Sequence, residues 1–535
     1  MKGPSLGEWR RLAKTIIWEN SEEGRRCLDI LALSYAELPH HLKWCFLYFS
    51  SFPEDFEILV EKLIRLWIAE GFVKHRAGET LEESAEGYLE ELVRRCMVIV
   101  IYPKSSQRCR IHDLLHDFTV AEAKEVGFLV CHRIPDDQDA SRLDSSVRRL
   151  SLYGGAQDYV SHVKFSTRLR SFLLFNSHRR GVISFHIIPT LKLLRVIDLE
   201  RAPLAVLPEQ IGDLVHLRFL GLKRTKIMSL PSSVGKLRHL QFLDVLWTDI
   251  RTMPSPVWKI EALRHVLVPP GVEPQMVDVC LRNLQVLKVV RTGSWIDSCL
   301  GSLTSLRELE LTDIKDCHVD ALSSSLPKLS GLKKLFLEGM SIPDCLWTST
   351  SFSSLEVLWL SGPVRRPQQP SSDGDHWPPN LTELILLNTR LDGDLIAALV
   401  NLPELSYLCI GDGAYTGKEM ICSRGGFPQL QFLLLSMNEL ERSNLKRWVA
   451  EAGTMLRLRS LKIYGCRKLA LLPEGLQHMT ALKDLTLRYM PPEFCSRARN
   501  GGEDWPKVRH IPSIIIEAIG GSFLIPEDGC TVRSM

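Results

Sequence analysis

A leucine pattern with a period of 23 residues constrains the fold of this chain more than any other feature. Within one repeat the spacing is L-x-x-L-x-L, as at Leu217, Leu220 and Leu222. The leading leucine then returns every 23 residues, at Leu194, Leu217, Leu240 and Leu263. This core at this period is typical of leucine-rich repeats, in which each unit adds one strand that cannot bury its leucines alone. The sequence therefore predicts an α/β leucine-rich-repeat solenoid, a curved horseshoe with a parallel sheet on its concave face.

Looser copies extend the array on both sides of the regular block. Fifteen leading residues are predicted, 21 to 28 positions apart, at Val147, Leu169, Leu194, Leu217, Leu240, Leu263, Leu284, Leu306, Leu332, Leu355, Leu381, Leu405, Leu430, Leu458 and Leu482. Because side chains alternate along a strand, the residues beside the buried leucines should face the concave surface.

Large aromatic residues are the candidates for partner contact on that surface. We place five of them just before the second leucine of their repeats, at Phe219, Phe242, Trp359, Tyr407 and Phe432. Aromatic side chains are enriched where proteins bind one another. The alternative is that these rings only pack against each other across adjacent strands.

Composition limits the other function classes. The 66 basic and 63 acidic side chains give a formal charge of +3, which does not indicate a nucleic-acid binder. The 14 cysteines include no C-x-x-C pair and fit a reduced interior. Neither a signal peptide nor an apolar run long enough to span a membrane is present, so we expect a cytoplasmic protein. No catalytic motif indicates an enzyme.

Before the repeats the pattern becomes helical. Apolar residues at helical spacing occupy 25–49 and break at Pro39. Pro53, followed by two acidic residues, predicts the start of a second helix, and Gly71 predicts its end. A third helix is expected at 79–95, followed by two strands around a turn at 104–106. Helices followed by a short hairpin predict a winged-helix domain.

Three segments of this region carry a family resemblance: LSYAELPHHLKWCFLYFSSFPEDFEI, LIRLWIAEGFV and RIHDLLHDFTVAEAKE. Together with the trailing repeats, they resemble the NB-ARC disease resistance proteins of plants, in the coiled-coil class. The resemblance implies an intracellular immune receptor switched by ADP and ATP. Its repeats would recognise a pathogen effector or a guarded host protein, and oligomerisation would need the full-length family architecture.

The resemblance also divides the chain. It implies a remnant of the preceding NB-ARC subdomain at 1–24 and a winged-helix domain at 25–130. A linker is expected at 131–146, the repeats at 147–490, and a C-terminal cap or tail at 491–535.

One motif of the family implies a nucleotide contact. Ile111, His112 and Asp113 match its Met-His-Asp motif, in which the histidine reaches the phosphate of bound ADP. The alternative is structural, with Asp113 capping the following helix and His112 merely preceding it. His112 and His116 also have the spacing of a zinc-protease helix, but Asp113 replaces the usual glutamate and no third ligand follows. A DNA-binding winged helix is a further alternative, although its expected recognition helix is acidic.

The family's phosphate-binding loop, G-x-x-x-x-G-K-[ST], is absent from the sequence. Gly235-Lys236 and Gly417-Lys418 both lack the upstream glycine. We therefore expect a partial gene model, a truncated product or a degenerate relative, which binds ADP or ATP weakly or not at all by itself. The remaining alternative is a leucine-rich-repeat adaptor or decoy scaffold that works without nucleotide.

Overall fold

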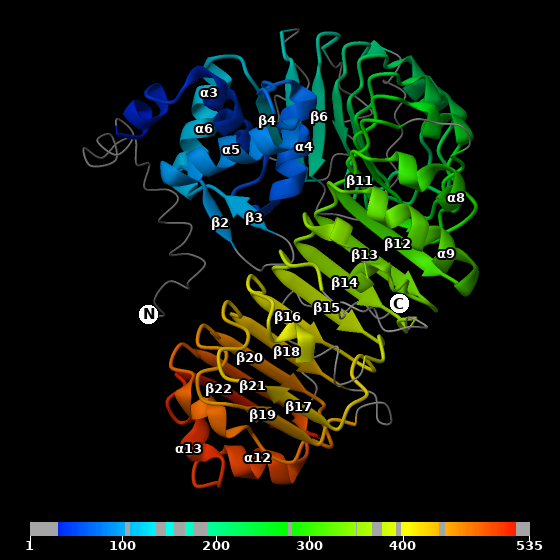
Figure 1. Cartoon of the computed structure of the whole chain (residues 1–535). Coiled ribbons are helices and arrows are strands. Elements are labelled where there is room, and N and C mark those ends of the chain that lie inside the picture. The colour runs from blue at the N-terminus through cyan, green and yellow to red at the C-terminus, as the bar shows by residue number, and fades with distance from the viewer. Residues whose placement is uncertain are drawn as a thin grey trace. The chain divides into compact units, whose positions relative to one another are not determined.

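A computed structural model describes residues 30–101, 107–134, 146–154, 166–175, 190–276, 281–348, 350–365, 377–391, 397–437 and 444–519. The chain divides into two compact units, Met1–Phe242 (unit 1) and Leu243–Met535 (unit 2). Figure 1 shows helices gathered near the N-terminal end of unit 1 and a ladder of strands in unit 2.

Unit 1 begins with a winged-helix domain. A three-stranded antiparallel sheet has the order β1-β3-β2. Its strands are β1 (Ile58–Leu59), β2 (Ile99–Ile101) and β3 (Arg108–Arg110). Around it lie the helices α3 (His40–Leu47), α4 (Val60–Glu70), α5 (Leu81–Arg94) and α6 (Asp113–Glu125).

Local chemistry sets the helix ends. α3 begins directly after Pro39, and α4 ends at Gly71 in a left-handed conformation with φ 85°, which glycine adopts without strain. At the start of α5, Thr80 and Glu83 form a reciprocal capping box. The expected helix start at Pro53 is wrong. Asp55 adopts φ 61°, so the chain turns and forms β1 before α4 begins.

The repeats of unit 1 build a parallel sheet in chain order. Its strands are β4 (Val130–Ile134), β5 (Arg149–Gly154), β6 (Ser171–Phe175), β7 (Val196–Asp198) and β8 (Phe219–Gly221). β4 starts at the last residue of the expected winged-helix domain, continues into the segment expected to be a linker, and pairs with β5 along its full length. β9 (Phe242–Asp244) begins at the last residue of the unit.

Unit 2 continues the same construction in a parallel sheet. Its strands are β10 (His265–Leu267), β11 (Val286–Arg291), β12 (Glu308–Ile314), β13 (Lys334–Gly339), β14 (Val357–Ser361), β15 (Glu383–Leu387), β16 (Tyr407–Ile410), β18 (Phe432–Ser436), β20 (Ser460–Tyr464), β21 (Asp484–Met490) and β22 (Ser513–Ala518). The short helices α8 (Trp295–Cys299) and α9 (Asp316–Ser325) lie on the opposite side from the strand ladder (Figure 1).

The predicted repeat phase is confirmed strand by strand. Each of the fifteen leading residues is followed, two positions later, by the first residue of a strand. Leu220 and Leu408, the second leucines of their repeats, are 0% and 2% exposed, so this position supplies the core in both units. Burying one leucine side chain contributes about 1.5–3 kcal/mol, and stacking makes that burial continuous.

The sequence pattern missed the last strand of the solenoid. β22 lies in the segment expected to be a cap or tail and pairs with β21. Its core positions are isoleucines in the run SIIIEA, so the leucine pattern does not include it. Two short helices, α12 (Pro492–Ala498) and α13 (Trp505–Val508), connect β21 to β22. A separate two-stranded sheet joins β17 (Glu419–Cys422) to β19 (Arg447–Ala450).

Candidate functional site

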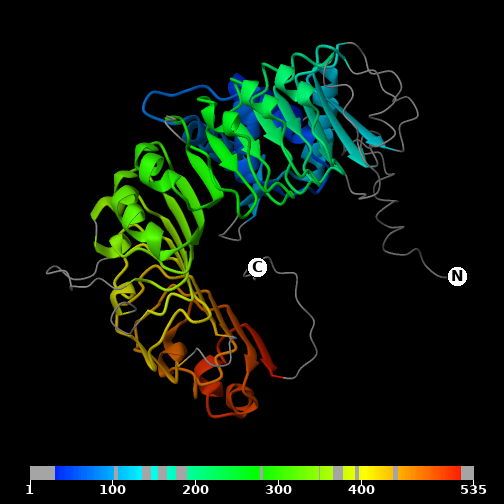
Figure 2. The ribbon, with the colours of Figure 1, turned by 90° about the vertical axis from the view of Figure 1, so that its right-hand side faces the viewer.

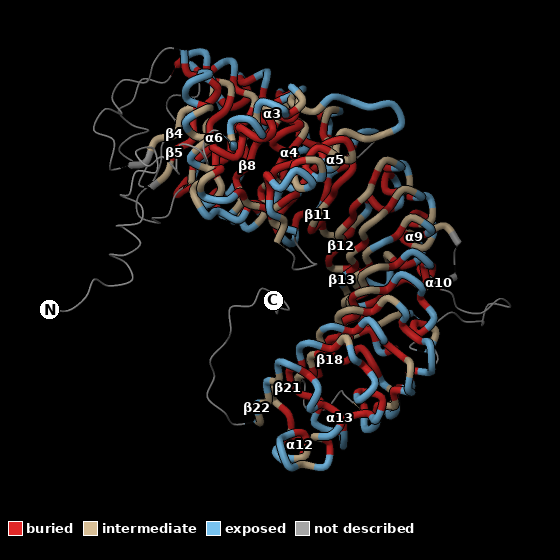
Figure 3. Tube along the Cα trace, turned by 90° about the vertical axis from the view of Figure 1, so that its left-hand side faces the viewer, coloured by how far each residue is buried: buried red, intermediate tan, exposed pale blue. Residues whose placement is uncertain are grey.

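The winged-helix domain and the first repeats share one hydrophobic core. α4 packs on β7 and β8, and the core cluster includes Trp67 of α4 together with Val196 and Phe219 of the repeats. Figure 2 shows the winged-helix elements, in blue, lying along one side of the first repeat strands. In Figure 3 the trace is largely buried along both α4 and β8. This interface makes unit 1 a single body.

Lys62 of α4 anchors the interface at one point. Its Nζ lies 2.6 Å from Asp198 Oδ2 and 2.7 Å from Glu200 Oε2, both on the third repeat. Burial disfavours the charged ammonium, but the two carboxylates outweigh that effect and raise the pKa of Lys62. Burial alone would raise the pKa of Glu200, yet Lys62 and Lys223 lower it. These shifts favour the charged forms of Lys62 and Glu200, whereas burial raises the pKa of Asp198 despite the opposing effect of Lys62.

Glu70, at the last turn of α4, is the second anchor. Its side chain is fully buried, and Oε2 accepts a hydrogen bond from Arg149 Nε at 2.8 Å. Ser171 donates its hydroxyl hydrogen to Oε1. The Arg149 guanidinium in turn lies 4.4 Å from the Phe128 ring centroid. One buried carboxylate thus joins α4 to the first two repeat strands.

The sequence analysis did not identify Lys62 or Glu70, although one signal was available. An acidic residue in the last turn of a helix is unfavourable, because that end carries partial negative charge. Glu70 stands there in the otherwise apolar run LWIAE. Such a carboxylate needs a cationic partner, but the sequence does not indicate that the partner is Arg149, 79 residues away.

Two of the predicted partner-binding aromatics require correction. Phe219 is 3% exposed and Phe242 is 1% exposed, and both belong to the core cluster that includes the winged-helix residues. Their ring centroids lie 6.2 Å apart. They are not accessible to a partner in this structure, because the winged-helix domain covers their part of the repeat surface.

The aromatic residues of unit 2 have a different setting. Tyr407 and Phe432 stack with centroids 4.7 Å apart and an interplanar angle of 3°. Tyr407 is only 8% exposed, whereas Phe432 is half-buried and carries Lys462 Nζ 5.4 Å from its ring centroid. Packing across adjacent strands, the alternative considered for these rings, therefore holds for this pair.

The placement of Trp359 was wrong by two residues, since Val357 holds the position just before the second leucine. Trp359 lies between the second and third core leucines and pairs in register with Phe336 and Ile385, not with Phe432. Trp359 and Phe336 are both half-buried, with centroids 5.9 Å apart. We call Phe336, Trp359, Ile385, Phe432 and Tyr464, all half-buried on the concave side of the sheet, the aromatic surface.

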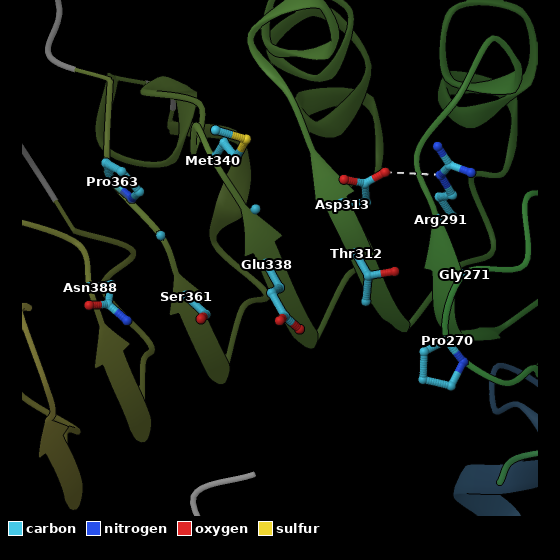
Figure 4. Close-up of a pocket in the computed structure, with 12 residues that line it drawn as sticks. Pro270, Gly271, Arg291, Thr312, Asp313, Glu338, Met340, Ser361, Pro363 and Asn388 are labelled. Carbon is cyan, nitrogen blue, oxygen red and sulfur yellow. Dashed lines mark hydrogen bonds and ion pairs between the residues drawn. The ribbon is translucent and has the colours of Figure 1, made fainter. Parts of the chain in front are cut away.

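An open groove of about 710 Å³ adjoins the aromatic surface at the carboxyl ends of β11 to β15. Figure 4 shows Arg291 and Asp313 joined across it, with Nε and Oδ2 2.9 Å apart. Glu338 is exposed on the groove wall, two residues after Phe336 on the same face of β13. Met340 is 76% exposed. The groove and the aromatic surface thus share strands and form one mixed apolar and charged face.

His112 and Asp113 lie at the start of α6, and both are exposed. The helix cap is His112 and not Asp113, as His112 Nδ1 accepts a hydrogen bond from the Leu114 N–H at 3.3 Å. Asp113 is the first helical residue, where its charge favours the helix dipole. With Nδ1 used as an acceptor, Nε2 carries the proton and can donate to a phosphate. The donor chemistry therefore fits the nucleotide contact that the resemblance implies.

Several residues of the zinc and DNA alternatives have other partners in the structure. His116 Nε2 lies 2.8 Å from Phe52 O, and no cluster of three or more metal-ligating side chains occurs in the part of the chain that the structure describes. A DNA-binding wing would need free basic residues, but two of the three on the β2–β3 hairpin are paired with acids: Arg108 lies 3.6 Å from Glu57 and Arg110 lies 3.3 Å from Asp55. Lys104, the third basic residue there, and the turn at 104–106 lie outside the described residues.

Comparison with known proteins gives two family matches. A leucine-rich repeat region matches residues 168–495, and the winged-helix domain of disease resistance proteins matches residues 52–119. Among solved structures, the matches include a leucine-rich-repeat protein of Leptospira interrogans, with 16% identity, 69% of this chain and 90% of that chain covered, and a TM-score of 0.38. The plant peptide hormone receptor RGFR1 in complex with RGF2 has 16% identity, 72% and 80% coverage, and a TM-score of 0.30.

Curated relatives from Arabidopsis thaliana match almost the whole chain. Probable disease resistance RPP8-like protein 4 is 33% identical over 541 residues, and disease resistance protein RPP8 is 33% identical over 543. Disease susceptibility protein LOV1 is 37% identical over 535 residues. Each alignment covers 95% of this chain, which spans 57–58% of the relative's own length.

In the residues that the structure describes, no helix is long and apolar enough to cross a membrane. The repeat match covers more than half of the chain. The winged-helix match precedes it in the sequence, as the winged-helix domain precedes the repeats in the structure. This chain belongs to the plant disease resistance proteins that carry a winged-helix domain and leucine-rich repeats.

Proposed function

We propose that this chain supplies the recognition surface and part of the switch of an intracellular plant immune receptor. The repeats of unit 2 bind a protein partner, which is a pathogen effector or a guarded host protein. The winged-helix domain of unit 1 responds to the nucleotide state of an upstream ADP- and ATP-binding module. Recognition and switching, not catalysis, are the activities of the chain.

The observation that carries this proposal is the open aromatic surface of unit 2. Its half-buried rings, Phe336, Trp359 and Phe432, lie on adjacent or nearby parallel strands and so present a fixed arrangement. Rigid aromatic side chains supply much of the binding energy in protein interfaces. Lys462 and Glu338 add charge at the margins, as in a polar rim. A partner with an apolar centre and charged edges fits this face.

The winged-helix domain supports the switching part of the proposal. His112 is held by its cap, so Nε2 presents a defined donor to an anion. A phosphate of ADP would accept that hydrogen bond when the upstream module holds the nucleotide. Loss of a hydrogen bond to a charged group costs about 1.5–3 kcal/mol, which is enough to shift a two-state balance tenfold or more.

Recognition is tested in a receptor that joins this chain to a nucleotide-binding module of the family, expressed in leaves and challenged with a panel of pathogen isolates. Replacing Trp359 and Phe432 by serine should abolish the response to every recognised isolate at unchanged protein level. The matched control replaces Val206 and Met228, which are 74% and 73% exposed on unit 1. Retained recognition by the Trp359→Ser/Phe432→Ser receptor would refute the proposed surface.

The switch is tested in the same receptor by Asp113→Val. If the His112–Asp113 pair favours the ADP-bound resting state, this variant signals without a pathogen, and cell death appears in untreated leaves. A purely structural role, in which the charge of Asp113 only favours the helix dipole, predicts a stability loss of about 0.3–1 kcal/mol and a lower protein level. A receptor that responds normally after changes at both His112 and Asp113 would favour the nucleotide-independent adaptor.

A further inference from the structure

A row of arginines runs across the amino-terminal ends of successive strands in unit 1. Arg148, Arg170, Arg195 and Arg218 occupy the same position in four consecutive repeats. The backbone fixes their spacing, since the N–H of Arg170 donates to Arg148 O at 2.7 Å and the N–H of Arg195 to Arg170 O at 2.6 Å. The N–H of Arg218 donates to Arg195 O at 2.8 Å. Adjacent strands lie about 4.8 Å apart, so these four residues, the arginine ladder, place like charges side by side.

In the part of the chain that the structure describes, no carboxylate is paired with the arginine ladder. Within the described residues, none of its four guanidinium groups donates a hydrogen bond or forms an ion pair. Glu70 is the nearby buried carboxylate, but it is already bonded to Arg149 and Ser171. Burial and then the neighbouring arginines lower the pKa of Arg170 and of Arg195, with Glu70 opposing the shift. Like charges brought together without a counter-ion destabilise the fold. An anionic group bound to the arginines would offset this electrostatic repulsion.

The surroundings add further positive charge. Arg168 and Arg238 are exposed in the turns that precede β6 and β9. Lys192 lies in another of these turns and pairs with Asp213 at 3.6 Å, an exposed contact that contributes little. Arg218 also lies against the carboxyl end of α4, beside Gly71, where the helix dipole is negative. The helix accounts for the position of one arginine and leaves the other three unexplained.

Two exposed aliphatic side chains identify the kind of anion. Leu193 is 40% exposed and Val215 is 52% exposed, in the turns before the strands of Arg195 and Arg218. A phosphate polymer has no apolar groups to cover them, and the exposed ring in these described turns is the small imidazole of His216, not a Phe, Tyr or Trp face. A peptide with alternating acidic and apolar residues would satisfy both the arginines and the aliphatic side chains.

We propose that the arginine ladder is a docking site for an acidic segment of a protein partner, with apolar residues interspersed among its carboxylates. The carboxylates would bond the guanidinium groups, which favour planar, two-pronged contact with carboxylate oxygens. The apolar residues would cover Leu193 and Val215. This site lies in unit 1 and uses none of the residues of the aromatic surface.

The test uses the full chain and a fluorescein-labelled peptide in which Glu and Leu alternate, with fluorescence anisotropy as the measurement. The chain should bind this peptide, and the affinity should fall as salt is raised, because the contacts are ionic. Arg170→Gln/Arg195→Gln should weaken binding roughly tenfold or more. The matched control, Arg251→Gln/Arg467→Gln, removes two exposed arginines from unit 2 and should bind as the unaltered chain does.

The ladder variant is expected to fold, since removing like charges relieves repulsion, and its thermal midpoint should equal or exceed that of the unaltered chain. If it does not fold, Arg148→Glu at the exposed end of the ladder serves instead. Equal binding by ladder variant and control would overturn the proposal, as would equal binding of a peptide with Gln in place of Glu. Tighter binding of inorganic polyphosphate or a single-stranded oligonucleotide than of the peptide would show that the partner class is wrong.

Discussion

The repeats of unit 1 and of unit 2 use the same strand position for opposite purposes. In unit 1 the residue before the second core leucine is Phe219 or Phe242, and each ring is buried in the core shared with the winged-helix domain. In unit 2 the same position holds Phe432, which is half-buried on the concave side of the sheet, and Tyr407, which is 8% exposed and stacks on Phe432. The repeat pattern fixes where such a ring is located. Whether such a ring is buried in the core or accessible to a partner depends on whether another domain packs on that strand.

The two units also differ in how they carry charge. In unit 1 the charged contacts between the winged-helix domain and the repeats are buried, as at Glu70 and Lys62. In unit 2 several ion pairs are more exposed, as between Arg447 and Glu419 at 3.0 Å. Removing one partner of a buried ion pair strongly destabilises a protein, whereas removing one partner of an exposed pair costs little. The comparison therefore makes quantitative predictions.

The largest expected effect is at Glu70. Glu70→Ala removes the buried carboxylate partner of the Arg149 guanidinium. It should therefore lower the free energy of unfolding of unit 1 by about 3–5 kcal/mol. Urea unfolding followed by tryptophan fluorescence measures this, since Trp67 belongs to the same core. The matched control Glu419→Ala should cost about 1 kcal/mol or less. Similar costs for the two variants would contradict the buried anchor.

The aromatic comparison gives the next largest difference. Phe219→Ala removes a ring from a closed core and should cost about 3–5 kcal/mol. Phe432→Ala removes a half-buried ring and its stacking with Tyr407, worth about 0.5–1.5 kcal/mol beyond the area it covers, so the total should be clearly smaller. Unfolding of the two variants under the same conditions is the measurement. A cost for Phe432→Ala that equals or exceeds that for Phe219→Ala would contradict the assignment of an open and a covered surface.

A smaller effect is expected at the C-terminal end of unit 2. Asp504 is buried and accepts hydrogen bonds from Lys507 at 2.9 Å and from the Leu472 N–H at 3.2 Å, and Arg497 also bonds it. Burial would raise the pKa of Asp504, but the bonds from Lys507 and Arg497 outweigh it and lower the pKa. The stabilisation is therefore complete above the unfolded pKa of about 3.9 and disappears as the pH falls through the lower folded value.

Thermal unfolding of the unaltered chain and of Asp504→Asn, as a function of pH, tests this account. At neutral pH the variant should be less stable by about 1.5–3 kcal/mol, since the bonds involve charged groups. Below the folded pKa of Asp504 the difference should vanish. A difference that stays constant from neutral to acidic pH would show that the charge of Asp504 is not what stabilises this end.

The sequence predicted the repeat phase, and the limits of that success have physical causes. Leucine spacing determines which residues are buried, so all fifteen predicted strands begin where expected. β22 was missed because isoleucines replace the leucines. The helix start at Pro53 was wrong because Asp55 adopts a left-handed conformation and β1 forms before α4 begins.

The candidate site was less predictable, since it depends on contacts between distant residues. Glu70 and Arg149 are 79 positions apart, and no local periodicity links them. The burial of Phe219 and Phe242 depends on the docking of α4, which repeat spacing alone does not indicate. Partner contact by Trp359, Tyr407 and Phe432, and nucleotide contact by His112 and Asp113, stay predictions.

The central claim is that the winged-helix domain covers Phe219 and Phe242 of unit 1, whereas Phe336 and Phe432 of unit 2 are half-buried and accessible. Hydroxyl-radical footprinting of the full chain, read by mass spectrometry, measures this directly by comparing phenylalanines of equal intrinsic reactivity. Phe336 and Phe432 should be oxidised readily, while Phe219 and Phe242 should be protected until the chain unfolds. Oxidation of Phe219 and Phe242 in the folded chain, at the rate of Phe336 and Phe432, would contradict the account.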